Sequence, residues 1–129
     1  MSTPDPYTSA RFRTDRDALG VSVDFIARRL DLADVTVWKY QAPNRTDPLP
    51  ERVRDLMDEL DATREQLVRE LAARPTVFRP RDDDEAADLY PAVAGWGSHA
   101  LGLILAAAVE RRASRGQSAA IEWTAEVTA

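Results

Sequence analysis

Apolar side chains recur along residues 23–30 at the spacing of one helix face, because Leu30 lies four positions after Ile26 and three after Ala27. Ser22 is the predicted N-cap of this helix, and residues 31–33 form a tight turn after it. A second short helix is predicted over residues 35–41. The small Ala27 lets the two helices cross closely. This order of elements indicates a helix-turn-helix, although a purely structural pair of helices has the same pattern.

The orientation of the second helix decides which side chains face outward. If Val37 and Tyr40 pack inward, residues 34–36, 38 and 39 form its outer face. A turn one residue longer would instead bury Trp38 together with Gln41, and a buried Gln41 would need a hydrogen-bond partner. We therefore favour the first orientation. Asp34 has two interpretations, the N-cap of this helix or an acceptor for a base, and we favour the cap.

The flanking segments supply the rest of an N-terminal helical bundle. A helix is predicted over residues 9–19, with Phe12 and Leu19 on its inner face and Gly20 ending it. Three prolines interrupt residues 42–50, so this stretch is expected to be a loop. A long helix follows over residues 50–73. Its apolar stripe consists of Val53, Leu56, Met57, Leu60, Leu67 and Leu71.

The C-terminal part combines short strands and helices. Strands are predicted over residues 76–79 and 120–124, and they are expected to pair. Between them, the acidic residues 82–85 begin a short helix, where the helix dipole explains them better than a metal site does. A second helix over residues 96–114 follows, and the single His99 near its start is expected to be structural. The result is a small β-α-α-β unit with an exposed edge.

The helix over residues 96–114 is apolar on every side between residues 101 and 109, so every side must be covered. A half-domain of about 50 residues can hardly do this alone. We therefore expect a second subunit to cover one side, with the exposed strand edge as a further association surface. The candidate dimerisation residues are Trp96, Leu101, Leu103, Ile104, Leu105, Val109, Ile121 and Trp123.

Composition and charge narrow the function. The 129 residues have a net charge of −5, but residues 1–50 contain seven basic and seven acidic side chains, so the acidic surplus lies downstream. Neutral charge predicts modest non-specific affinity for nucleic acid. The chain has no Cys, its first residues do not resemble a signal peptide, and residues 101–109 are too short to span a membrane, so a cytoplasmic protein without a membrane partner is expected. No catalytic motif, metal site or cofactor site is found, so an enzyme is not expected.

Residues 10–73 resemble the lambda-repressor-like (Xre-type) helix-turn-helix domain, through Ala27, the pair Val37 and Tyr40, and the loop into Pro50. The whole layout is similar to the anti-CRISPR-associated (Aca-type) autorepressors. This second resemblance rests on residues 38–40, which begin eleven positions after Ala27, on residues 50–53, and on residues 95–96 before the last helix and strand. It implies a C-terminal dimerisation domain and a dimer that binds an inverted repeat to repress its own operon, in a bacterial or phage-infected cell. The chain departs from the pattern at Asp31, where Gly is usual, and at Gln41, where an acidic residue is usual.

The predicted fold is mainly α: a flexible arm (1–8), a helix-turn-helix DNA-binding domain with a long fourth helix (9–74) and a β-α-α-β dimerisation domain (75–129). The predicted function is a homodimeric repressor that binds double-stranded DNA at an inverted repeat, with recognition helices about 34 Å apart. The alternatives are an antitoxin-like or adaptor protein-interaction module, and a protein that binds structured RNA with the same face. The candidate DNA-contact residues are Ser22, Arg28, Asp34, Val35, Thr36, Trp38, Lys39, Asn44, Arg45 and Thr46.

Overall fold

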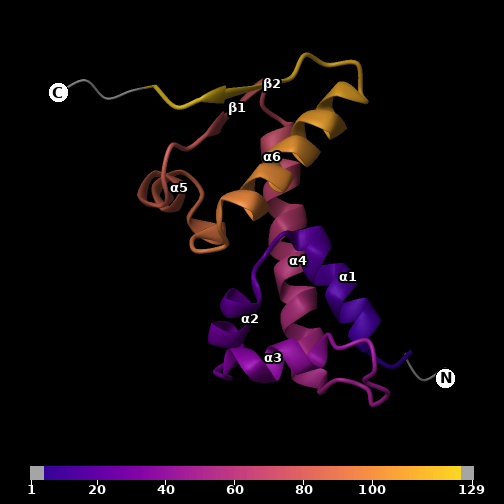
Figure 1. The fold of residues 1–129 in the computed structure, drawn as a ribbon. Helices are drawn as coiled ribbons and strands as arrows, with labels where there is room; N and C mark the ends of the chain where they lie inside the picture. Colours follow the sequence, from indigo (N-terminus) through magenta and orange to yellow (C-terminus); the bar gives the residue numbers. More distant parts are fainter. Residues whose placement is uncertain (1–4, 126–129) are drawn as a thin grey trace. The chain divides into compact units, whose positions relative to one another are not determined.

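The computed structural model describes residues 5–125 and is mainly helical, with one small two-stranded sheet (Figure 1). The chain forms two compact units, Met1–Asp61 and Ala62–Ala129. The long helix α4 (Glu51–Ala72) begins in the first unit and ends in the second. The sequence placed a domain boundary at residue 74, after this helix, whereas the apolar stripe of α4 contributes to the core of each compact unit in turn.

Three helices precede α4 in the first unit, and they gather around its first half (Figure 1). They are α1 (Ser9–Leu19), α2 (Val23–Leu30) and α3 (Asp34–Tyr40). The first two have the predicted bounds, because each has its cap: the Thr8 and Ser22 hydroxyls accept backbone hydrogen bonds at their N-termini. Gly20 ends α1 with φ 72°, as predicted. The fully buried side chains of this unit are Phe12, Val21, Ile26, Ala27, Val37, Val53 and Leu60.

The sequence predicted a flexible arm over residues 1–8; residues 5–8 make specific contacts through Tyr7, and residues 1–4 lie outside the described part of the chain. Tyr7 is buried, and its carbonyl accepts a hydrogen bond of 2.9 Å from the Leu49 backbone. Its hydroxyl donates to Asp15 at 2.7 Å, and the Arg54 guanidinium lies 5.2 Å from its ring centre. Burial, helped by Asp15, raises the pKa of Tyr7 above its ordinary value of 10.0. An aromatic ring with these contacts holds the segment in place.

The second unit contains the paired strands that the sequence predicted, with the helices between them. The elements are β1 (Thr76–Arg79), α5 (Asp83–Leu89), the 3-10 turn η1 (Pro91–Val93), α6 (Ser98–Ala113) and β2 (Ala120–Trp123). The strands are parallel, with Val77 opposite Ile121, because a helical crossover joins them. The Asp82 carboxylate caps α5 by accepting from the Glu85 backbone at 2.8 Å. The helix expected from Trp96 begins at Ser98, since Gly97 has φ 98°, which is not a helical angle.

Helix α6 is covered by its own chain on one side only. Ala100, Leu101, Ile104, Leu105 and Ala108 are buried, whereas Leu103 and Val109 are partly exposed and Ala106 is exposed. At its far end, Arg111 donates two hydrogen bonds to Glu65 on α4, at 2.8 and 3.0 Å. Among residues 5–125, no helix has both the length and the apolar character needed to cross a membrane.

The Glu65–Arg111 pair predicts a pH-dependent contribution to stability. The hydrogen bonds from Arg111 lower the pKa of Glu65 below its ordinary value of 4.5. A carboxylate with a lowered pKa stabilises the fold fully above its unfolded pKa, and this contribution is lost as the pH falls through the folded value. We expect Glu65→Gln to lower the free energy of unfolding at neutral pH and to have no effect at the acid end. Urea unfolding at neutral pH and then in steps below pH 4.5 measures this.

The matched control is Glu70→Gln, because Glu70 lies on the same helix and accepts a hydrogen bond of 2.9 Å from the neutral Gln66. A difference between Glu65→Gln and the original protein that persists at the lowest pH would contradict the prediction.

Candidate functional site

Helices α2 and α3 are joined by three residues, and the conformation of Asp31 makes this turn possible. Asp31 has φ 56° and ψ 49°, the left-handed conformation that glycine adopts most easily. Asp is among the few other residues that adopt it at modest cost. The Leu32 amide then donates to the Ala27 carbonyl at 2.9 Å and closes the end of α2. Asp31 therefore gives this turn the backbone geometry that a glycine would give.

Helix α3 begins one residue earlier than predicted, so the assignment of Asp34 as its N-cap is wrong. Ala33 occupies the cap position, and no side chain there accepts a hydrogen bond. Asp34 is the first residue of the helix, where its charge interacts favourably with the helix dipole. Its carboxylate is exposed.

The outer face of α3 is the one that the preferred orientation predicted. Val37 and Tyr40 are buried, at 0% and 8% exposure. Within the described part of the first unit, residues 5–61, Val35 and Trp38 are the most exposed large apolar residues, at 58% and 57%. Beside them, Asp34 and Lys39 are exposed and Thr36 is partly exposed. This face is therefore mainly apolar, with one cation and one anion.

Gln41 follows α3 and is buried, although Trp38 is not. The alternative orientation would have buried Trp38 and Gln41 together, but Gln41 is buried alone, because α3 ends at Tyr40 and Gln41 departs from the helical direction with ψ 11°. Its side-chain oxygen accepts a hydrogen bond of 3.0 Å from Arg16 on α1. Arg16 also donates to the Val21 carbonyl at 3.0 Å, so one guanidinium holds three segments together. Neither contact was predicted.

The charges expected around this face are present, but several are already engaged. Arg28 forms an ion pair with Asp24 at 3.2 Å. Arg45 lies 5.3 Å from the centre of the Tyr40 ring and donates to the Asp47 carbonyl at 3.3 Å. The other candidates for phosphate contacts, Ser22, Asn44 and Thr46, are exposed. Asp31 and Asp34 are exposed as well, so the charge near α3 is mixed in sign.

Half of the predicted dimerisation residues belong to the core of the second unit. Trp96, Leu101, Ile104 and Leu105 are at most 5% exposed, so the expectation that they contact a partner is wrong. Their own unit buries them because the strands and the other helices cover that side of α6. Leu103 and Val109 are partly exposed, and Ile121 and Trp123 are exposed at 43% and 62%.

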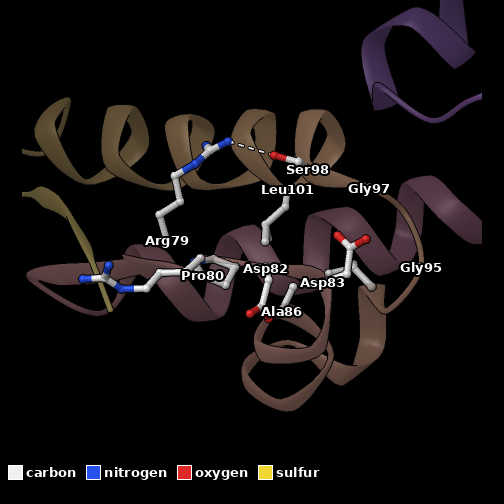
Figure 2. Close-up of a pocket in the computed structure, with 11 residues that line it drawn as sticks. Arg79, Pro80, Asp82, Asp83, Ala86, Gly95, Gly97, Ser98 and Leu101 are labelled. Carbon is white, nitrogen blue, oxygen red and sulfur yellow. Dashed lines mark hydrogen bonds between the residues drawn. The ribbon is translucent and has the colours of Figure 1, made fainter. Parts of the chain in front are cut away.

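A small cavity of about 130 Å³ lies in the second unit, between β1, α5 and the start of α6 (Figure 2). Arg79 crosses its rim and donates to the Ser98 hydroxyl at 3.1 Å (Figure 2). The guanidinium lies so close to Gly102 that a Cβ there would be 2.9 Å from an Arg79 nitrogen. A glycine inside an apolar helix is the signal that could have revealed this close approach. Residues 5–125 contain no cluster of three metal-ligating side chains.

No protein-family model, no curated protein and no solved structure matches this chain. The outer face of α3 carries the exposed Val35 and Trp38, and β2 carries the exposed Ile121 and Trp123.

Proposed function

We propose that the chain is a homodimeric DNA-binding repressor in which α2, the turn and α3 act as a helix-turn-helix. The observation that supports this most is the exposure of Val35 and Trp38 on α3, at 58% and 57%. A folded domain gains nothing from exposing two large apolar side chains on one helix face, whereas a binding surface does. In a helix-turn-helix, this is the face of the second helix that enters the major groove.

The side chains on this face suit base contacts better than non-specific attraction. Lys39 can donate to guanine O6 and N7 or to a phosphate. Val35, Thr36 and Trp38 offer apolar contact to the methyl group of thymine. Asp34, although it does not cap α3, can accept a hydrogen bond from the amino group of cytosine. Polar residues outside α3 would then contact phosphates; they are the exposed Ser22, Arg28, Asn44 and Thr46 and the partly exposed Arg45.

Neutral charge in residues 1–50 has a consequence for affinity. Seven basic and seven acidic side chains give little sequence-independent attraction to DNA. A single α3 would therefore bind weakly, and two copies on an inverted repeat would be needed for useful affinity. An operator of this symmetry next to its own gene would make the protein an autorepressor.

The second candidate function is a protein-interaction module, of an antitoxin-like or adaptor type. The observation that favours it is the mixed charge near α3, since Asp31 and Asp34 are exposed and Arg28 is engaged by Asp24 at 3.2 Å. An apolar helix face of this kind also suits a groove on a partner protein. Structured RNA is a third ligand class for the same face.

The experiment that separates these functions is selection from random DNA and RNA pools with the purified full-length protein. We expect an enriched double-stranded DNA sequence with an inverted repeat. Lys39→Ala should then weaken binding to that sequence by about tenfold at fixed salt, because one good base contact contributes about 1–3 kcal/mol. Arg13→Ala removes an exposed cation from α1 and is the matched control, with little expected change.

Failure to enrich any DNA sequence, or enrichment of RNA alone, would contradict the proposal. Unchanged operator affinity for Lys39→Ala would contradict the assignment of this face.

A further inference from the structure

The strand β2 has an open edge. Within residues 5–125 its only strand neighbour is β1. The Ala120 and Thr124 amides donate to the carbonyls of Pro75 and Arg79, at 2.9 and 3.1 Å. Because backbone groups alternate in direction along a strand, those of Ile121 and Trp123 point away from β1. An edge of this kind is a template for pairing with another strand.

Two apolar side chains of β2, Ile121 and Trp123, lie at this edge on the face of the sheet that carries α6. Val77 and Arg79 lie opposite Ile121 and Trp123 in the register, so these four share one face. Val77 is buried at 2% exposure, and Arg79 lies between the Trp123 ring, 5.8 Å from its centre, and Gly102 of α6. Trp123 is nevertheless 62% exposed and Ile121 43%, because nothing in the described chain covers them beyond β1 and α6.

The outer side of α6 carries a second exposed surface of this unit. His99, Leu103, Ala106 and Glu110 follow one another at steps of four, three and four residues, so they form one stripe along the helix. The stripe lies opposite the buried side of α6. Its centre is apolar, with a partly exposed Leu103 and an exposed Ala106, and its two ends are a histidine and a glutamate.

We propose that this surface binds a second copy of the chain through antiparallel pairing of β2 with β2 of the partner, with the two α6 helices side by side on one face of the resulting four-stranded sheet. The inference deepens the proposed homodimer by naming its interface. The geometry of that interface rests on the second unit alone and does not depend on what α3 binds.

The polar side chains at the two ends of the stripe favour a second copy as the occupant. In an antiparallel pair of α6 helices centred between Leu103 and Ala106, His99 of each copy faces Glu110 of the other. A two-fold axis at Ile121 pairs the outward backbone groups of Ile121 with each other and sets Glu122 opposite the small Ala120. An axis at Glu122 would instead place two carboxylates directly opposite, which is unfavourable. The same surface is thus complementary to itself, as a two-fold interface requires.

The test compares two positions with equal exposure on opposite faces of the sheet. Ile121 and Phe78 are both 43% exposed, but only Ile121 belongs to the proposed interface. Analytical ultracentrifugation of the full-length protein should give a dimer for the original chain and for Phe78→Lys. Ile121→Lys should raise the dimer Kd by about 30-fold or more, the change expected for a central interface residue. Circular dichroism should confirm that both variants are folded.

A second measurement uses the absence of cysteine from the chain. Ile121→Cys should form a disulfide-linked dimer on mild oxidation, whereas Phe78→Cys should not. A monomeric original protein, a dimer unaffected by Ile121→Lys, or equal cross-linking at both positions would overturn the interface. These outcomes are independent of DNA selection: a dimer with this interface and no preferred DNA sequence would refute only the proposed function.

Discussion

Replacing Trp38 by Ala is expected to weaken binding to the selected operator by about 10- to 100-fold, the range of a good base contact. The free energy of unfolding should change by less than about 1 kcal/mol, as for most surface substitutions. The difference follows from the position of Trp38, which is 57% exposed on α3 while Val37 and Tyr40 hold that helix in the core. Titration of labelled operator with each protein, at one salt concentration, measures the first quantity. Urea unfolding measures the second.

Two variants sharpen this test. Trp38→Phe keeps an apolar aromatic ring on the same face and should recover most of the affinity. Such a recovery would show that the contact depends on the apolar ring and not on the full size of Trp38. Leu89→Ala removes an exposed apolar side chain of α5, 43% exposed, and should leave operator affinity unchanged. If Trp38→Ala bound the operator as well as the original protein, α3 would have to present another face. If stability and affinity fell together, Trp38 would be a structural residue.

The strongly periodic segments could be predicted from the sequence, and their boundaries followed from local caps. The bounds of α1, α2 and β1 are as predicted. For the two helices the reason is local, since Thr8 and Ser22 cap their N-termini and Gly20 ends α1. The pairing of the two strands was also predicted, and it is confirmed, with the parallel direction set by the helices between them. The helix bounds depend on capping residues close in the sequence, and the direction of strand pairing depends on the single crossover between β1 and β2.

The features that the sequence missed depend on contacts between distant residues. Burial of Gln41 requires Arg16, twenty-five positions away, and nothing in the local pattern points to that pair. The N-terminal segment is anchored by Tyr7 against Asp15 and Leu49, although its prolines and small residues suggested a loose arm. Local propensity cannot anticipate such contacts, because the free energy that holds these residues comes from tertiary packing.

Helix α6 shows why an apolar segment does not identify an interface. Its sequence could not tell which apolar residues its own chain would cover, and four of the eight dimerisation candidates proved to be core residues. The four that remain exposed or partly exposed are Leu103, Val109, Ile121 and Trp123. The proposed interface uses three of them, with the edge of β2 between the two copies.

Replacing Phe12 by Ala is expected to lower the free energy of unfolding by about 3–5 kcal/mol, the range for truncating a buried aromatic ring. Phe12 lies on α1, is fully buried and is among the largest fully buried side chains of the chain. Because small domains are stabilised by only about 5–15 kcal/mol, this loss should unfold a large part of the population at modest urea concentration. Urea unfolding followed by circular dichroism measures the shift.

Phe78→Ala is the matched control, because it removes the same ring from a site that is 43% exposed. Its cost should be below about 1 kcal/mol, since a half-exposed ring leaves no closed cavity. The loss of Phe12 should also affect DNA binding, because α3 is held in the same core by the buried Val37. Phe12→Ala should therefore lower operator affinity in proportion to the unfolded fraction, although Phe12 has no exposed atom to contact DNA. Equal costs for the two Phe→Ala variants would contradict the assignment of Phe12 to the core.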